Sequence, residues 1–237
     1  MKIKMFLSAL LIAFSATASA QFMQSGGTKS AASADIKPNY NRIFASYAPV
    51  SISLSPSLSK KDYTVPDSFQ GFQVGWLGGF NIVKNIPLYI EVGANVQAAF
   101  HTEKETDYYD DYNISYTYVG VNIPVNIAYK YTFPNTNISV SPYAGLKLRG
   151  NIICQMETED DTYSLFDEDF LGDYTAKRIS LGYQIGVGFT FSKFYLGIGY
   201  TGDLTAFEKF EIETNNKQTE DVKLKTSGLV ATVGVEF

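Results

Sequence analysis

Acidic side chains gather in two stretches of the sequence, and their chemistry is that of metal ligands. Residues 156–177 hold eight carboxylates, and residues 101–111 hold five more. Carboxylate oxygens are ligands that Ca²⁺ prefers, so four residues are candidate metal ligands: Asp160, Asp161, Asp167 and Asp169. The stretch lacks the alternating Asp/Asn pattern with a central glycine of an EF-hand loop. A solvated surface of like charges is therefore the simpler interpretation.

The single histidine, His101, lies beside the second acidic stretch. An enzyme that acts on lipid or peptide at the rim of a membrane barrel needs a histidine with a Ser or Asp partner, and Asp107 is the partner that the sequence offers. No nucleophile motif accompanies the pair, so we expect no catalytic site and no cofactor, and a rim enzyme is an alternative. The single cysteine, Cys154, is expected to be a small apolar side chain that faces lipid.

Three charged residues, Glu91, Lys147 and Arg149, share the polar phase of alternating segments. If these segments are strands of a small closed barrel, the charges point inward, where eight strands leave only enough room for side chains. We therefore predict an interior network of salt bridges and hydrogen bonds that neutralises the charges. A pore for small solutes is the alternative.

The elements that must position these residues are eight runs in which apolar and polar side chains alternate. Alternation with a period of two indicates a strand with one apolar face. The runs cover 42–55, 70–80, 87–100, 112–133, 137–154, 178–191, 193–207 and 223–237. The phase of the first run slips near Pro49, and because proline cannot donate to a strand ladder we predict a bulge there.

The connections between the runs alternate in length without exception. The long ones are 55–69, 101–111, 156–177 and 208–222, and the short ones are 81–86, 132–136 and 192–193. Outer-membrane barrels have long outer loops and short periplasmic turns. The pattern predicts an all-β fold, an eight-stranded antiparallel up-and-down transmembrane β-barrel in a Gram-negative outer membrane, with both termini periplasmic.

Aromatic residues gather at both ends of the runs, where a membrane barrel carries its girdles. The predicted periplasmic girdle contains Phe80, Tyr129, Tyr131, Phe133, Phe189, Phe191, Phe194 and Phe237. The predicted outer girdle contains Phe69, Phe72, Phe100, Tyr116, Tyr118 and Phe207. A soluble lipocalin-like barrel is the fold-level alternative, and it would require apolar side chains inside and polar ones outside.

The two ends of the sequence complete the predicted organisation. Residues 1–20 have the basic start, the short apolar run and the small residues of a secretory signal peptide. Residues 21–40 are rich in Ser, Ala and Gly and are expected to be a flexible periplasmic segment, which leaves 41–237 for the barrel. Acidic residues outnumber basic ones by 24 to 19, which excludes a nucleic-acid partner because that requires a basic surface.

Together, the signal peptide, the alternating strands, the Gly-rich second strand, the acidic loops and the terminal Val-Gly-Val-Glu-Phe resemble the small outer-membrane β-barrel proteins of Bacteroidota over about 42–237. The resemblance implies outer-membrane lipid as surroundings and a barrel-assembly machinery that reads Val233, Val235 and Phe237. Members of this group mostly carry no assigned activity. We therefore expect a structural or surface-contact role, with an extracellular ligand bound through the acidic loops.

Overall fold

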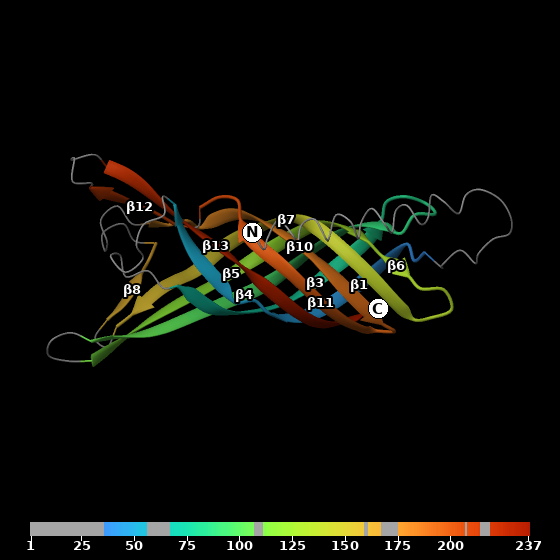
Figure 1. The fold of residues 1–237 in the computed structure, drawn as a ribbon, viewed down its shortest axis with the longest axis horizontal. Helices are drawn as coiled ribbons and strands as arrows, with labels where there is room; N and C mark the ends of the chain where they lie inside the picture. Colours follow the sequence, from blue (N-terminus) through green and yellow to red (C-terminus); the bar gives the residue numbers. More distant parts are fainter. Residues whose placement is uncertain are drawn as a thin grey trace, which may run out of the picture. The chain divides into compact units, whose positions relative to one another are not determined.

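The computed structural model shows a closed, antiparallel β-barrel. It describes residues 36–55, 67–106, 111–158, 161–166, 175–206, 208–213 and 219–237, and the barrel lies within the unit Lys37–Phe237. Neighbouring strands follow the order β1-β3-β4-β5-β7-β10-β11-β13, and β13 pairs again with β1. The predicted eight-stranded up-and-down barrel is confirmed (Figure 1). The predicted signal peptide lies outside the described residues.

The barrel is built from eight principal strands and five shorter strands. The principal strands are β1 (Asn39–Tyr47), β3 (Ser68–Asn81), β4 (Leu88–Thr106), β5 (Asp111–Tyr129), β7 (Ile138–Glu157), β10 (Ile179–Phe191), β11 (Phe194–Asp203) and β13 (Thr219–Glu236). The shorter ones are β2 (Val50–Ser55), β6 (Tyr131–Thr132), β8 (Thr162–Ser164), β9 (Thr175–Ala176) and β12 (Glu208–Glu213). No helix in this described part of the chain is long and apolar enough to cross a membrane.

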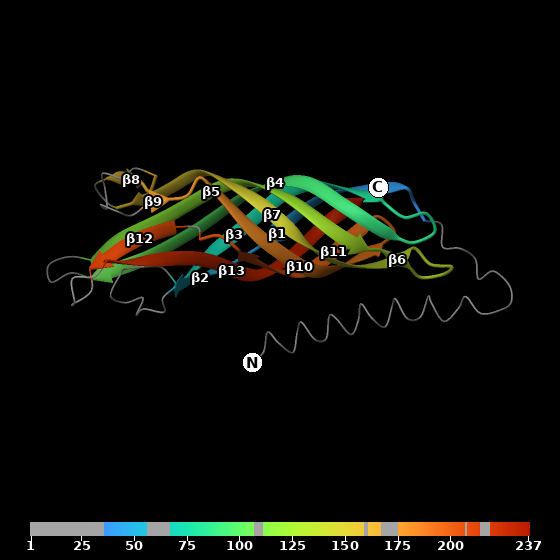
Figure 2. The same ribbon diagram turned by 90° about the horizontal axis from the view of Figure 1, so that it is seen from above.

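The strands are staggered, so they wind around the barrel at an angle. A path of paired residues once around the barrel starts at Asn41 in β1. It returns at Ser51 in β2, which continues β1 beyond Pro49, ten residues further along the chain. The path runs through Gly78, Val92, Val125, Leu146, Tyr183, Gly202 and Ser227. A stagger of this size corresponds to a strand tilt of about 40°. The tilt is plain in Figures 1 and 2.

The two ends of the barrel differ. At the end that carries β6 and the C-terminus, tight turns reverse the chain at Asn85, Asn135 and Ser192, each with a φ near 60°. We call this end the turn end. The opposite end, which carries β8, β9 and β12 in Figures 1 and 2, is the loop end. The predicted alternation of short and long connections therefore matches the structure, although much of 101–111 and 208–222 is strand rather than loop.

Apolar side chains cover the outside of the barrel, as the alternation predicts. The exposed apolar residues include Ile43, Phe72, Val74, Trp76, Ile90, Val96, Ile123, Val125, Ile127, Leu146, Leu148, Leu196, Ile198, Leu229 and Val233. Buried polar side chains line the inside, among them Asn95, Gln97, Asn122, Asn126, Ser139 and Ser141. This arrangement is the reverse of a soluble lipocalin-like barrel, so that fold-level alternative is wrong for this part of the barrel. We call the zone of exposed apolar side chains the belt.

The predicted bulge at Pro49 is wrong. Tyr47 pairs with Ala231 and Ser51 pairs with Ser227, so the register is the same on both sides of the proline. The side chains therefore continue to alternate without a slip, and Val50 points into the barrel. Because proline has no backbone N–H, the ladder lacks one hydrogen bond at Pro49, but the register of the strand does not change.

A register shift occurs instead between β5 and β7. Val119 pairs with Ile153 and Gly120 pairs with Asn151, so β7 has one extra residue at this point. The extra residue exposes two consecutive isoleucines and turns the next side chain, Cys154, into the barrel, where it is 1% exposed and packs against Leu165. The prediction that Cys154 faces lipid is therefore wrong, because the bulge reverses the phase of β7.

Candidate functional site

The polarity of the barrel inverts towards the loop end. Inward side chains there are apolar, and a buried cluster contains Val50, Ile52, Phe69, Ala99, Ile114, Tyr116 and Leu224. Outward side chains there are exposed and polar, namely Ser51, Ser53, Ser68, Gln70, Thr102, Lys104, Gln155, Glu157 and Lys223. We call this part of the barrel the head. A polar outside and an apolar inside suit water, whereas the belt has the reverse pattern and suits lipid.

Strand length agrees with a head that stands outside the membrane. β4 and β5 each have 19 residues and β7 has 20. At roughly 3.3 Å per residue and a tilt of about 40°, such a strand rises about 48 Å along the barrel axis. The apolar band of an outer-membrane barrel is only about 25 Å tall, so about half of each long strand projects beyond it.

The head corrects the predicted outer aromatic girdle. Phe72 and Phe100 are 53% and 44% exposed and face outward, as predicted. Phe69 and Tyr116 are buried, and the rings of Phe69 and Tyr118 meet edge to face with centroids 5.0 Å apart. These three rings belong to the interior of the head, because they occupy the inward phase of their strands. Phe207 lies outside the described residues.

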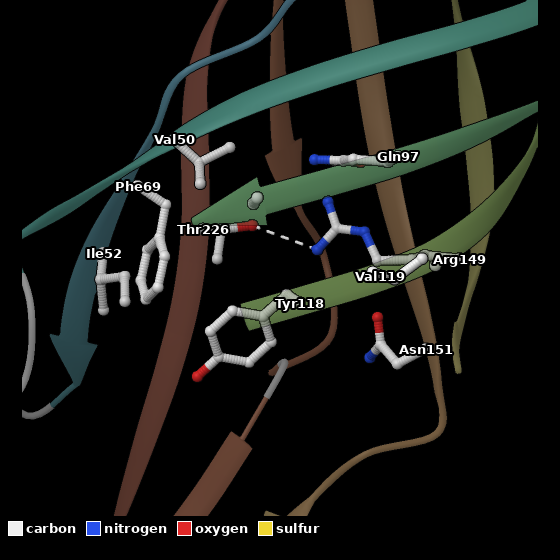
Figure 3. Close-up of a pocket in the computed structure, with 11 residues that line it drawn as sticks. Val50, Ile52, Phe69, Gln97, Tyr118, Val119, Arg149, Asn151 and Thr226 are labelled. Carbon is white, nitrogen blue, oxygen red and sulfur yellow. Dashed lines mark hydrogen bonds between the residues drawn. The ribbon is translucent and has the colours of Figure 1, made fainter. Parts of the chain in front are cut away.

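A cavity of about 40 Å³ lies where the head meets the belt (Figure 3). On its head side the lining is apolar and includes Val50, Ile52, Phe69, Ala99 and Tyr118. On its belt side the lining is polar and consists of Gln97, Arg149, Asn151 and Thr226. In Figure 3 the guanidinium of Arg149 extends from its strand into the cavity, towards Thr226. The site therefore combines an apolar wall with a buried cation.

Asp203 and Thr226 hold Arg149 in place. Nη1 of Arg149 lies 3.3 Å from Oγ1 of Thr226, to which it donates, and 3.5 Å from Oδ1 of Asp203. Oδ2 of Asp203 accepts hydrogen bonds from N and Oγ1 of Thr226, at 2.8 and 2.5 Å. The carboxylate thereby links β7, β11 and β13 at the middle of the lumen.

A second ionic cluster lies towards the turn end. Glu236 accepts hydrogen bonds from Nη2 of Arg42, at 2.9 Å, and from Nζ of Lys130. Glu91 lies 3.5 Å from Nη1 of Arg42 and accepts a hydrogen bond of 2.5 Å from the hydroxyl of Tyr40. All four charged residues are buried, and two positive charges face two negative ones. We call this group the turn-end cluster.

The guanidinium of Arg42 is also held by an aromatic ring. It stacks on Tyr195, 3.6 Å from the ring centroid. The ring fits because Gly188 lies beneath it, where a Cβ atom would come within 2.3 Å of Cε2 of Tyr195. A cation over an aromatic face is stabilised by the ring quadrupole, so the turn-end cluster is fixed by more than ion pairs.

The predicted network residues Glu91, Lys147 and Arg149 are all buried in the lumen. Glu91 belongs to the turn-end cluster, and Arg149 belongs to the group at the cavity. Lys147 is 3% exposed. The sequence prediction missed Arg42 and Asp203 as partners. For Asp203 a signal was present, because it lies on the inward phase of a strand whose outward residues are apolar.

The structure gives no metal centre among the candidates that it describes. Asp161 is exposed, and its carboxylate accepts a hydrogen bond of 3.1 Å from the hydroxyl of Tyr163. Asp160, Asp167 and Asp169 lie outside the described residues. Across the described ranges, no three His, Cys, Asp or Glu side chains come together as metal ligands.

His101 lies in the head, where its described neighbours include Glu103 and Phe69. Its Nε2 is 3.5 Å from Oε2 of Glu103, and its ring is 5.5 Å from that of Phe69. Asp107, the partner that the sequence offers, lies outside the described residues. The observed surroundings are those of a packed aromatic side chain.

The C-terminal residues close the barrel. The backbone N–H of Phe237 donates to the carbonyl of Asn41, and the N–H of Asn41 donates to the carbonyl of Phe237, both at 2.9 Å. Val233, Val235 and Phe237 are 57%, 44% and 59% exposed and face outward together. The three residues of the predicted assembly signal therefore form one exposed apolar row at the seam.

The sequence matches the family described as outer membrane protein beta-barrel domain over residues 6–237, so the chain belongs to this family. It is an integral β-barrel protein of the cell outer membrane, in agreement with the apolar belt. A search of curated proteins gave no match.

Several solved outer-membrane proteins are similar to this chain. OprG from Pseudomonas aeruginosa has 11% sequence identity and a TM-score of 0.47, covering 86% of this chain and 98% of its own. Ail, the attachment invasion locus protein of Yersinia pestis, in complex with the heparin analogue sucrose octasulfate, has 14% identity and a TM-score of 0.41, covering 85% of this chain and 100% of its own. Neisserial surface protein A has 15% identity and a TM-score of 0.40, covering 85% and 98%.

Proposed function

We propose that this outer-membrane barrel is a non-enzymatic surface-contact protein whose head carries the contacts. The observation that supports the proposal is the inversion of polarity between the belt and the head. The head has its own apolar core and an exposed polar outside, so it is a folded extension of the barrel and not a set of short loops. A rigid surface presented in water loses little conformational entropy when a partner binds.

The proposal includes an orientation. The head faces the outside of the cell, and the tight turns with the C-terminus face the periplasm, as in other outer-membrane barrels. In a Cys154→Ala background, Thr102→Cys should react with a membrane-impermeant maleimide on intact cells, whereas Asn135→Cys should react only after lysis. Both positions are exposed in the structure. The reverse labelling pattern would place the head in the periplasm and end the proposal.

The hairpin of β4 and β5 allows the contact role to be tested without disturbing the belt. Thr102 and Ser115 are directly paired, so residues 103–114 can be replaced by an Asn-Gly turn that keeps the register. Cells with this shortened hairpin should retain wild-type levels of heat-modifiable barrel in the outer membrane. Their attachment to mucin- or fibronectin-coated glass should fall to that of cells without the protein.

A matched control keeps the full hairpin and changes only two of its exposed side chains, Lys104→Ser and Asn113→Ser. This variant should attach like the wild type. Equal attachment by the shortened and full-length proteins on both surfaces would refute the contact role. So would wild-type cells that attach no better than cells without the protein.

Three finer expectations belong to this proposal. The apolar row at the seam supports recognition of Val233, Val235 and Phe237 by the barrel-assembly machinery. The belt supports outer-membrane lipid as its surroundings. The resemblance to the barrels of Bacteroidota supports a source in that group.

A further inference from the structure

Two lysines stand on the outside of the barrel at the loop end of β13, where β12 runs beside it (Figure 2). Lys223 and Lys225 are two positions apart, so their Cα atoms are about 7 Å from each other. Lys223 is exposed and Lys225 is half-buried, whereas Leu224 between them is 1% exposed. Because side chains alternate along a strand, both lysines point away from the barrel interior.

The pairing of β12 brings a third lysine to the same surface. Ala176 in β9 and Leu224 in β13 pair with one residue of β12, Glu208, from opposite sides. Both pairings are antiparallel, so the residues that follow, Lys177 and Lys225, lie across from each other. Two strand spacings separate them, about 10 Å, and a lysine side chain is long enough for both ammonium groups to reach one ligand between them. We call Lys177, Lys223 and Lys225 the lysine patch.

The described surroundings leave the charge of the lysine patch unmatched. None of its three lysines makes an ion pair with a described residue. Nζ of Lys225 donates to the carbonyl of Leu204, at 3.2 Å, which orients the ammonium and leaves two of its protons for another acceptor. Asp203, which precedes Leu204, is buried and is held in the lumen by Arg149 and Thr226. The patch therefore presents positive charge to its surroundings.

Exposed apolar side chains lie next to the lysine patch, at the edge of the belt. Ile179, Leu204 and Leu229 are 67%, 46% and 59% exposed. Ile179 begins β10, Leu204 lies beside Lys225, and Leu229 follows four residues further along β13, towards the turn end. The outer surface thus changes from apolar to basic within a few residues. A membrane lipid has the same order, because its apolar chains lie in the bilayer core and its phosphate lies in the headgroup region.

We propose that the lysine patch binds the phosphate of a membrane lipid whose acyl chains lie on Ile179, Leu204 and Leu229. The ammonium groups donate charge-assisted hydrogen bonds to the phosphate oxygens. A phosphate monoester, with a charge of about −1.5 to −2 at neutral pH, suits a surface with three cations. A soluble anion would use the lysines alone, so the apolar side chains beside them favour a lipid. The inference rests on lipid as the surroundings of the belt, and not on the surface-contact role.

Preference for phosphatidic acid over phosphatidylcholine tests the site, since phosphatidic acid carries a phosphate monoester on the same acyl chains. Dissociation constants are measured by native mass spectrometry of the purified, full-length mature protein titrated with each lipid. A lysine near an anionic lipid surface contributes about fivefold to binding, so phosphatidic acid should bind at least tenfold more tightly. Protein that enters phosphatidylcholine bilayers but binds both lipids equally would overturn the phosphate site alone. Protein that enters no bilayer would contradict lipid as the surroundings of the belt.

Two triple variants remove the same charge from opposite ends of the barrel. One changes the lysine patch and the other changes three exposed lysines near the turn end: Lys177→Gln, Lys223→Gln and Lys225→Gln, against Lys37→Gln, Lys84→Gln and Lys193→Gln. The patch variant should lose the preference for phosphatidic acid, and the turn-end variant should keep it. Equal losses in the two variants would overturn the proposal, because the lipid would then respond only to net charge.

Fluorescence quenching locates the bound lipid. In a Cys154→Ala background, a bimane label is placed at Ser227→Cys, two residues from Lys225, or at Thr117→Cys. Both positions are half-buried, and Thr117 lies on β5, four strands from β13 in either direction and paired with Phe100.

Phosphatidic acid with brominated chains should quench the label at position 227 at least twofold more than brominated phosphatidylcholine does at the same mole fraction. At position 117 the two lipids should quench equally. An excess of inorganic phosphate should leave the difference intact, and its loss would reveal a site for free anions and not for a lipid. Equal quenching by both lipids at position 227 would also overturn the proposal.

Discussion

Glu236 is the residue whose change should disturb the barrel interior most clearly. Its side chain is 7% exposed and bridges Arg42 and Lys130. In Glu236→Gln these two cations would share only Glu91, and the turn-end cluster would change from neutral to a net charge of +1. Removing one partner of a buried ion pair costs about 3–5 kcal/mol. Because Lys130 is 9% exposed and near the turn end, we expect the lower limit, about 3 kcal/mol.

A loss of about 3 kcal/mol lowers the folding equilibrium constant by roughly a hundredfold. Reversible folding of the purified chain from urea into lipid vesicles measures it, and this assay avoids any effect of the change on cellular assembly. The only tryptophan, Trp76, is 44% exposed on the belt. Its fluorescence therefore reports transfer from water into lipid.

Two variants show whether charge is the cause. Glu236→Gln combined with Lys130→Met restores neutrality, so it should recover at least half of the lost stability. Glu157→Gln removes an exposed carboxylate from the head and should change stability by less than about 0.5 kcal/mol. The reasoning is refuted if Glu236→Gln lies within 1 kcal/mol of the wild type at an unchanged denaturant slope.

The remaining predictions concern the belt, the ends of the chain and the lumen. In the same vesicle assay, Val96→Arg should cost about 2–4 kcal/mol, and Thr102→Arg on the same face of β4 less than about 1 kcal/mol; similar costs would mean that the belt does not end between them. Deletion of Phe237 should lower the amount of barrel in the outer membrane, and normal amounts would contradict its role in assembly. Mass spectrometry should find Gln21 as the first residue of the mature protein, not Met1. Planar-bilayer recordings should show no conductance steps, because the two cavities described in the lumen measure only about 40 and 60 Å³; regular steps would support the pore alternative.

The belt was predictable because every strand that crosses lipid must carry apolar side chains on its outward face, and this pattern can be seen in each strand separately. In the alternating run from Leu88 to Phe100, the outward members are exposed from Ile90 to Val96 and at Phe100, and Leu88 and Ala98 are half-buried. The tight turns were predictable for the same reason, because each short connection lies between two successive alternating runs. Local patterns of this kind need no knowledge of neighbouring strands.

The head was not predicted, because the same alternation has the opposite meaning in water. The predicted phase slip at Pro49 would put Val50 and Ile52 on the outward row, although both are buried and occupy the inward phase. Once polar residues such as Ser51 and Ser53 are exposed, the apolar residues between them must point inside. The sequence does not mark where lipid ends.

The interior pairs and the bulge were beyond single-strand reasoning. Arg42 and Glu236 are 194 positions apart, and their contact depends on the closing register between the first and last strands. The register shift beside Gly120 depends on two strands together, and it decides the direction of Cys154. Such features become visible only when the stagger around the barrel is known.

The pairing of Asn41 with Phe237 also has a consequence for the order of folding. The seam joins residues from the two ends of the barrel sequence, so the loop to be closed is almost the whole chain. Contacts with such a large sequence separation form slowly. Until β13 pairs with β1, both strands have open edges that can pair with other chains. The barrel must therefore be kept from aggregating until β13 has been exported and can pair with β1.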